Sequence, residues 1–96
     1  MPTYETLDVF WRDWERLTTD EKGAFLRAVE KLVVDIDAGR IRSGLRVKHV
    51  QGTRGIYELT WADDGRATFE YGIEQRLGEP HVIWRRIGTH DIFREP

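Results

Sequence analysis

The chain has no cysteine among its 96 residues, and it has neither a long apolar run nor an excess of positive charge. Without cysteine it can form no disulfide and no thiolate metal site, which fits a reducing compartment. Its apolar runs are too short for a signal peptide or a membrane span, so we expect a cytoplasmic protein with no membrane partner. The formal net charge of −2 argues against a generic nucleic-acid binder.

The length predicts a single domain over residues 1–96, large enough to bury a core without disulfides. Charge is distributed unevenly along it. The first 38 residues contain nine acidic and five basic groups, whereas the remainder contains ten basic and eight acidic groups. A basic surface on the second half and salt bridges between the two halves are both consistent with this distribution.

Two amphipathic helices are predicted in the first 38 residues. The first is indicated by apolar residues at helical spacing, namely Leu7, Phe10, Trp11, Trp14 and Leu17. The second begins at Thr18 or Thr19, has acidic residues in its first turn, and ends before Gly39. We expect the aromatic side chains of the first helix to face the core.

From Leu45 onward, apolar and polar residues alternate with the period of β-strands. The pattern predicts strands over residues 45–49, 56–61, 67–71 and 82–88, a tight hairpin at 63–66, and a polar loop over 75–80. The fold class is therefore α+β, with two N-terminal helices packed on one face of a four-stranded, mainly antiparallel sheet. The other face of the sheet stays at least partly open.

The last predicted strand leads into the most suggestive side chains of the chain. Gly88 allows a turn, and His90 follows it close to Arg85, Arg86 and Arg94. Guanidinium groups bind phosphate and an imidazole transfers protons near neutral pH, so the group suits phosphate chemistry. The alternative interpretation is a solvated strand edge with His90 capping a loop.

Other types of site lack a pattern in this sequence. The three histidines have no metal-ligand spacing, Ser43 is the only serine, and no glycine-rich phosphate loop precedes a helix. We therefore expect no metal and no cofactor. The open face would carry Lys48, Glu58, Thr60, Thr68 and Glu70, flanked by His49 and His90. Such a face could support RNA cleavage by 2′-hydroxyl attack, which needs a base, an acid and cations around the phosphate.

Three segments in this order and spacing resemble the RelE/ParE/HigB superfamily, the toxins of bacterial type II toxin–antitoxin systems. They are VKHVQG at 47–52, GIYEL at 55–59 and RRIGTHDIF at 85–93, and they are most similar to the HigB-like and YafQ-like branches. The resemblance spans essentially the whole chain. It implies a ribosome-dependent mRNA endonuclease that inhibits translation, a cognate antitoxin as partner, contact with operator DNA only through that antitoxin, and no cofactor.

The resemblance also assigns roles to individual residues. His90, Arg85, Arg86 and Lys48 are the expected catalytic group, and Phe93 is expected to stack on a base. Additional substrate contacts are expected from Arg94, Arg54, Arg66 and His49.

The chain departs from the family pattern at two positions where arginines are usual, because it has Thr60 and Thr68 instead. Losing two phosphate-binding cations favours two alternatives, a ParE-like inhibitor of DNA gyrase and a catalytically decayed protein that only binds an antitoxin. A third hypothesis is an interaction module that uses Trp11 and Trp14 as its partner surface.

Overall fold

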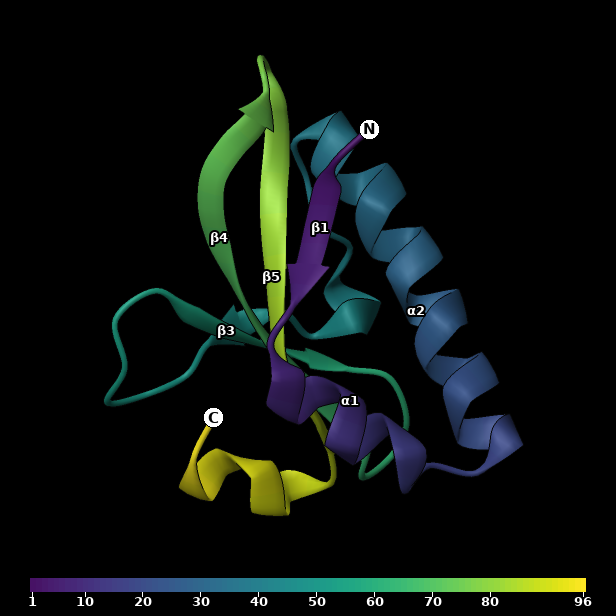
Figure 1. The fold of residues 1–96 in the computed structure, drawn as a ribbon. Helices are drawn as coiled ribbons and strands as arrows, with labels where there is room; N and C mark the ends of the chain where they lie inside the picture. Colours follow the sequence, from purple (N-terminus) through teal and green to yellow (C-terminus); the bar gives the residue numbers. More distant parts are fainter.

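The computed structural model describes residues 1–96 as an α+β fold, confirming the predicted class (Figure 1). A five-stranded sheet has the order β1-β5-β4-β3-β2. Its strands are β1 (Thr3–Thr6), β2 (Lys48–His49), β3 (Ile56–Thr60), β4 (Arg66–Arg76) and β5 (Glu79–Gly88). The helices are α1 (Asp8–Glu15), α2 (Thr19–Ala38) and two short 3-10 segments, η1 (Ser43–Leu45) and η2 (His90–Arg94).

Local sequence signals account for the bounds of α2. Thr18 caps its N-terminus by accepting a hydrogen bond from the Glu21 backbone N–H, and the Glu21 side chain accepts one from the Thr18 N–H. This reciprocal capping box satisfies two backbone donors that have no partner within the helix. Gly39 ends the helix at φ 75°, a left-handed conformation that favours glycine.

The sheet differs from the prediction by one strand, since β1 pairs in parallel with β5 at the edge of the sheet. Its sequence, Thr-Tyr-Glu-Thr, lacks the alternation of apolar and polar residues by which the other strands were identified. Because its partner lies 78 residues further along the chain, no local pattern indicates the pairing. The addition places β5 between β1 and β4, so the last strand lies inside the sheet and not at its edge.

Two predicted boundaries were wrong. The polar stretch 75–80 is not a loop: β4 continues to Arg76 and β5 begins at Glu79, joined by a turn in which Gly78 has φ 80°. The strand predicted over 45–49 is reduced to Lys48–His49, because residues 43–45 form a 3-10 turn that buries Leu45. The hairpin predicted at 63–66 is present between β3 and β4.

The core lies between α2 and one face of the sheet. It combines Phe10 of α1 and residues of α2 with apolar side chains of the sheet, and its buried members include Phe25, Leu32, Leu59, Phe69, Trp84 and Ile87. In Figure 1, α2 runs obliquely alongside the sheet, while α1 and η2 lie at the end opposite the tip of the β4–β5 hairpin. None of the helices is both long and apolar enough to cross a membrane.

The expectation that the aromatic residues of α1 all face the core was only partly right. Phe10 is buried, whereas the side chain of Trp11 remains 49% exposed. Trp11 and Tyr4 border an apolar groove of about 260 Å³ between β1, α1 and α2. The groove is lined by no charged residue.

Candidate functional site

His90 and Asp64 form an exposed hydrogen-bonded pair where the sheet ends beside the tip of the β3–β4 hairpin. His90 Nδ1 and Asp64 Oδ1 are 2.5 Å apart, and more than half of each side chain is accessible to solvent. Thr89 caps η2 by accepting a hydrogen bond from the Asp91 N–H, so the segment that carries the imidazole is anchored. The ring of Phe93 meets the imidazole edge to face, with centroids 5.8 Å apart.

The electrostatics of this pair select one form of the imidazole. The hydrogen bond from His90 is the main cause that lowers the pKa of Asp64 below its usual value, with smaller contributions from the charges of His90 and Arg66. Asp64 is therefore ionised at neutral pH and can only accept hydrogen bonds. It favours the tautomer with the proton on Nδ1, which leaves the Nε2 lone pair free to accept a proton.

Arg85 and Arg86 are held by a β-bulge in β5. Trp84 pairs with Phe69 and Arg86 pairs with Thr68, so Arg85 is an extra residue opposite a regular stretch of β4. Arg85 donates to Glu70 Oε2 at 2.6 Å and to the Pro96 carbonyl at 3.2 Å. Its guanidinium thus ties β4 to the C-terminal residues.

Arg86 forms the more buried of these ion pairs, with Asp13 of α1. Its Nε and Nη2 donate to the two carboxylate oxygens at 2.7 and 3.1 Å, and Nη1 donates to the Glu95 carbonyl at 3.0 Å. Asp13 also accepts a hydrogen bond from the Ile87 N–H. The hydrogen bond to Asp13 raises the pKa of Arg86. Both arginines are therefore satisfied by protein groups.

A cleft of about 580 Å³ lies between α1, the β3–β4 hairpin and η2, next to the His90–Asp64 pair. Its charged lining residues are mostly acidic, with Asp13, Glu21, Asp63, Asp64 and Asp91 against Arg16 and Arg86. Arg16, at the end of α1, takes part in none of the molecule's ion pairs. Sequence reasoning did not identify Arg16, Asp13 or Asp64 as site residues, because each reaches this place only through tertiary packing.

The other residues named from sequence are dispersed. Lys48 lies 3.7 Å from Glu58, in the cross-strand row that continues through Thr68 to Arg86. The expectation that this whole face is open was wrong at Thr68, which is completely buried. His49 belongs to the next row and packs edge-on against Tyr57.

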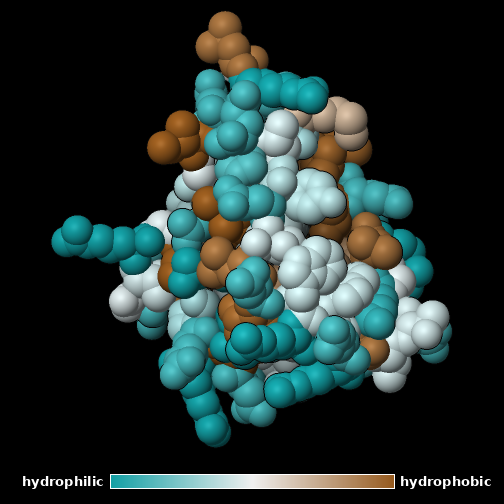
Figure 2. Space-filling model, in the orientation of Figure 1, coloured by the Kyte–Doolittle hydropathy of each residue, from teal (hydrophilic) through white to brown (hydrophobic).

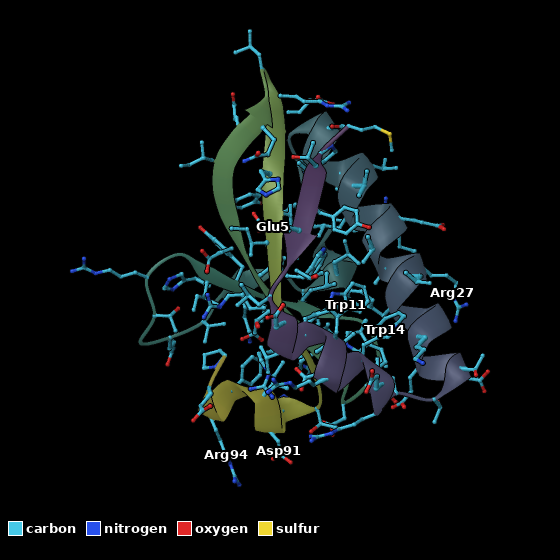
Figure 3. All side chains as sticks on the ribbon, viewed as in Figure 1. Glu5, Trp11, Trp14, Arg27, Asp91 and Arg94 are labelled. Atoms are coloured by element: carbon cyan, nitrogen blue, oxygen red, sulfur yellow. The ribbon has the colours of Figure 1, made fainter.

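The remaining arginines are also separated from one another. The Arg66 guanidinium is buried and donates to the carbonyls of Ala62, Asp63 and Gly65, so it closes the hairpin. Arg54 lies in the exposed turn before β3. Arg94 extends away from the molecule at the end of η2 (Figure 3). The structure brings His90, Asp64 and Phe93 together, and it does not bring Lys48, His49 or Arg54 to them.

The two threonines that replace family arginines differ in their surroundings. Thr68 is completely buried, and its Oγ1 accepts a hydrogen bond from the Arg86 N–H at 3.1 Å. Thr60 is only half-buried and lines a separate cleft beside α2. A buried hydroxyl at position 68 leaves no room there for an exposed cation. No cluster of three or more potential metal-ligating side chains occurs in the chain.

Solved structures that resemble this chain include toxins and a toxin–antitoxin complex. The chain matches one from the RelB–RelE antitoxin–toxin complex of Methanococcus jannaschii with TM-score 0.63 and 12% identity, over 94% of each chain. It matches a YafQ mutant from E. coli with TM-score 0.63 and 11% identity, over 95% of this chain and 96% of that one. The corresponding values for a YoeB/ParE toxin from Agrobacterium tumefaciens are 0.53, 15%, 92% and 98%.

By sequence, no known family and no curated protein matches the chain. The fold is that of the RelE-type toxins, as the resemblance in the sequence predicted. At 11–15% identity, this likeness establishes the architecture alone. The chemistry depends on the residues that this chain places at the site.

Proposed function

We propose that this chain is the toxin of a type II toxin–antitoxin system and that it cleaves RNA with His90 as the proton acceptor and Asp64 as the residue that positions it. The observation that carries the proposal is the 2.5 Å hydrogen bond between an exposed imidazole and an exposed carboxylate, beside an aromatic ring. Its occurrence on the fold of RelE and YafQ supports the choice of reaction.

In the proposed reaction, the His90 Nε2 accepts the proton of a ribose 2′-hydroxyl. The 2′-oxygen attacks the adjacent phosphorus, the bond to the 5′-oxygen breaks, and that oxygen takes up a proton from a water molecule as it leaves. The imidazolium of His90 then returns its proton to the solvent. A 2′,3′-cyclic phosphate and a 5′-hydroxyl result. Asp64 positions the imidazole and stabilises the imidazolium that forms, the role a carboxylate plays in other histidine-based sites. Phe93 would hold a base by stacking.

The cations in this proposal differ from those expected. Arg85 and Arg86 retain their assigned role only by exchanging protein partners for phosphate, since both are engaged by carboxylates. Arg16 lines the cleft beside the pair and is free of such partners. We assign the first phosphate contact to Arg16, with Arg94 as the second free cation in this region.

Induction of the chain alone in a bacterial host, with mapping of mRNA 5′ ends, tests the proposal. Growth arrest accompanied by new mRNA ends is the expected result, and ends in register with codons would identify the ribosome as the place of cleavage. Arrest with intact mRNA and altered DNA supercoiling would contradict cleavage in favour of gyrase inhibition.

A non-enzymatic role is the alternative that a specific observation favours. The cleft beside His90 is lined by five acidic and two basic side chains, which disfavours the approach of phosphate. In that case the chain would bind a protein target or only its antitoxin. Unchanged growth, unchanged mRNA and unchanged supercoiling on induction would support a decayed toxin.

The apolar groove bordered by Trp11 and Tyr4 is the surface we assign to the antitoxin. The Leu7 N–H bonds to the Trp84 carbonyl, so in this parallel ladder Thr3 and Glu5 face β5, while the backbone groups of Tyr4 and Thr6 face outward. An extended segment could add to this free edge and place apolar side chains in the adjoining groove. The antitoxins in the complexes of RelE and YafQ support a protein partner of this kind.

A further inference from the structure

A second cleft, of about 490 Å³, separates α2 from the β3–β4 hairpin and η1. Three basic side chains line it, two from α2 and one from the residue that follows η1. Arg27 and Lys31 lie one turn apart on α2, and Arg46 follows η1. Asp63 is the only acidic residue in the lining. Figure 3 shows Arg27 on the side of α2 that faces away from β1.

These three cations have no acidic partner. Arg42, Lys48, Arg85 and Arg86 each lie within 4.0 Å of a carboxylate oxygen, and Arg27, Lys31 and Arg46 take part in none of these pairs. In a protein of net charge −2, positive charge that is both unpaired and gathered in one concave surface creates a local attraction for anions. The cleft beside His90, by contrast, has mostly acidic residues among its charged side chains, so the two clefts differ in the sign of their charge.

Arg46 occupies an unfavourable backbone conformation to reach this place. It is the only residue other than glycine with a positive φ, at 50°. This left-handed region strains an arginine and suits glycine. A glycine at position 46 would relieve the strain and remove the charge. The substitution should therefore not lower the stability of the fold, and a loss of anion binding could be attributed to the lost charge.

Trp61 connects this cleft to the candidate active site. Together with Ala62 and Asp63 it lines both clefts, so the two meet along the β3–β4 hairpin whose tip carries Asp64. The indole Nε1 is buried without a hydrogen-bond partner. A positively charged groove is the part of a single-stranded nucleic-acid site that meets the phosphates. Trp61, which is half-buried and packs against the core and Gly65, forms the wall shared by the two clefts.

We propose that the cleft lined by Arg27, Lys31, Arg46 and Trp61 binds the backbone of single-stranded RNA and leads the strand over the β3–β4 hairpin to His90. The choice of RNA rests on the function proposed above. The site itself rests on the unpaired cations and on the continuity of the two clefts.

Fluorescence anisotropy with a fluorescein-labelled 2′-O-methyl RNA of about 12 nucleotides tests the proposal, since this probe lacks the hydroxyl needed for cleavage. We expect the triple variant Arg27→Gln/Lys31→Gln/Arg46→Gly to bind at least about tenfold more weakly. The slope of log affinity against log salt should fall by about two units, at about 0.7 per phosphate contact. The matched control, Arg12→Gln/Arg40→Gln/Arg76→Gln, removes the same charge from exposed positions outside both clefts and should retain most of the affinity.

Arg46→Gly alone gives a readout that a purely structural role would not produce. We expect its unfolding midpoint in urea to rise or stay unchanged while RNA affinity falls about threefold or more, and Arg46→Lys should restore the affinity. Equal losses in the test and control triples, or no loss in either, would overturn the proposal, as would preferential binding of duplex DNA of the same length.

The outcome is separable from that for the proposed function. If His90→Ala abolishes cleavage and the cleft variants bind RNA normally, the cleft proposal fails and the nuclease stands. If induction leaves mRNA intact and RNA binding still depends on the three cations, the nuclease fails and the cleft proposal stands.

Discussion

At the scale of single residues, His90 and Asp64 divide the proposed chemistry between proton transfer and positioning. His90→Ala should reduce RNA cleavage about 10²–10⁴-fold, the usual contribution of general acid–base catalysis. Asp64→Asn should retain part of the activity and change the pH dependence of cleavage, because an amide no longer selects the Nδ1-protonated form. Single-turnover cleavage of an RNA substrate from pH 5 to 9 measures both effects.

The stability of the fold is the control for the two substitutions. Both side chains are exposed, so neither substitution should change the urea unfolding midpoint noticeably. An Asp64→Asn variant with a wild-type pH profile would remove Asp64 from the mechanism.

Arg86 shows how a residue expected to be catalytic can be structural as well. Arg86→Gln leaves the buried Asp13 carboxylate without its guanidinium partner, and we expect a loss of about 2–4 kcal/mol in the free energy of unfolding. Asp13→Asn combined with Arg86→Gln should recover part of that loss, because no unpaired charge remains. Urea unfolding of the two single variants and the double variant provides the measurement.

Loss of toxicity in Arg86→Gln would therefore say little about catalysis unless stability is measured beside it. An unchanged unfolding free energy in Arg86→Gln would show that the ion pair contributes nothing to the fold, and a loss of toxicity in that variant would then assign Arg86 to the catalytic group.

At the scale of elements, the sequence indicated those whose signals are local. The capping box at Thr18 and Glu21 and the glycine after α2 define that helix within a few residues of chain. The β3–β4 hairpin is equally local. By contrast, β1 acquires its structure from β5, and Asp64 meets His90 across 26 positions. The composition of the site was thus partly predictable, whereas its pairings were not.

The edge strand β1 provides a prediction about partner binding. In Tyr4→Pro the substituted residue loses an N–H that faces outward, so the pairing of β1 with β5 should survive and the urea midpoint should change little. In Glu5→Pro the lost N–H faces β5, and we expect a loss of about 1–3 kcal/mol in unfolding free energy. Circular dichroism during urea unfolding distinguishes the two variants.

The same pair of variants tests the assigned antitoxin surface. Co-expressed with its antitoxin, Tyr4→Pro should escape neutralisation and arrest growth more strongly than the wild type, because the added strand loses a hydrogen bond. Tyr4→Val, which keeps the N–H, serves as control. Full neutralisation of Tyr4→Pro would place the antitoxin elsewhere on the molecule.

At the scale of the whole molecule, the surface separates by character into parts that different partners would use. Figure 2 shows hydrophobic side chains in scattered groups between hydrophilic ones on the face drawn. The apolar groove, the acidic cleft beside His90 and the basic cleft beside α2 have distinct linings. Sequence periodicity predicts which residues lie on the surface. The net charge of −2 does not reveal that acidic and basic side chains line different clefts, because it averages over surfaces that only the fold defines.

Acid stability offers a test of how the basic cleft is held together. Asp35, near the end of α2, accepts hydrogen bonds from the Arg42 backbone N–H, Nε and Nη2 at 2.9, 2.8 and 2.8 Å. These bonds to Arg42 lower the pKa of Asp35 to about 2. The contact anchors the segment that leads from α2 into η1 and on to Arg46.

Because the pKa of Asp35 is lower in the folded than in the unfolded chain, the unfolded chain takes up the proton first as the pH falls. The stabilisation is complete above about pH 4, the usual pKa of an aspartate, and is lost progressively toward pH 2. Asp35→Asn should therefore lower the urea midpoint at pH 7 and flatten its decrease between pH 4 and pH 2, as followed by tryptophan fluorescence. A decrease in Asp35→Asn as steep as in the wild type would assign acid unfolding to other carboxylates and leave the anchoring of η1 to packing of Leu45 alone.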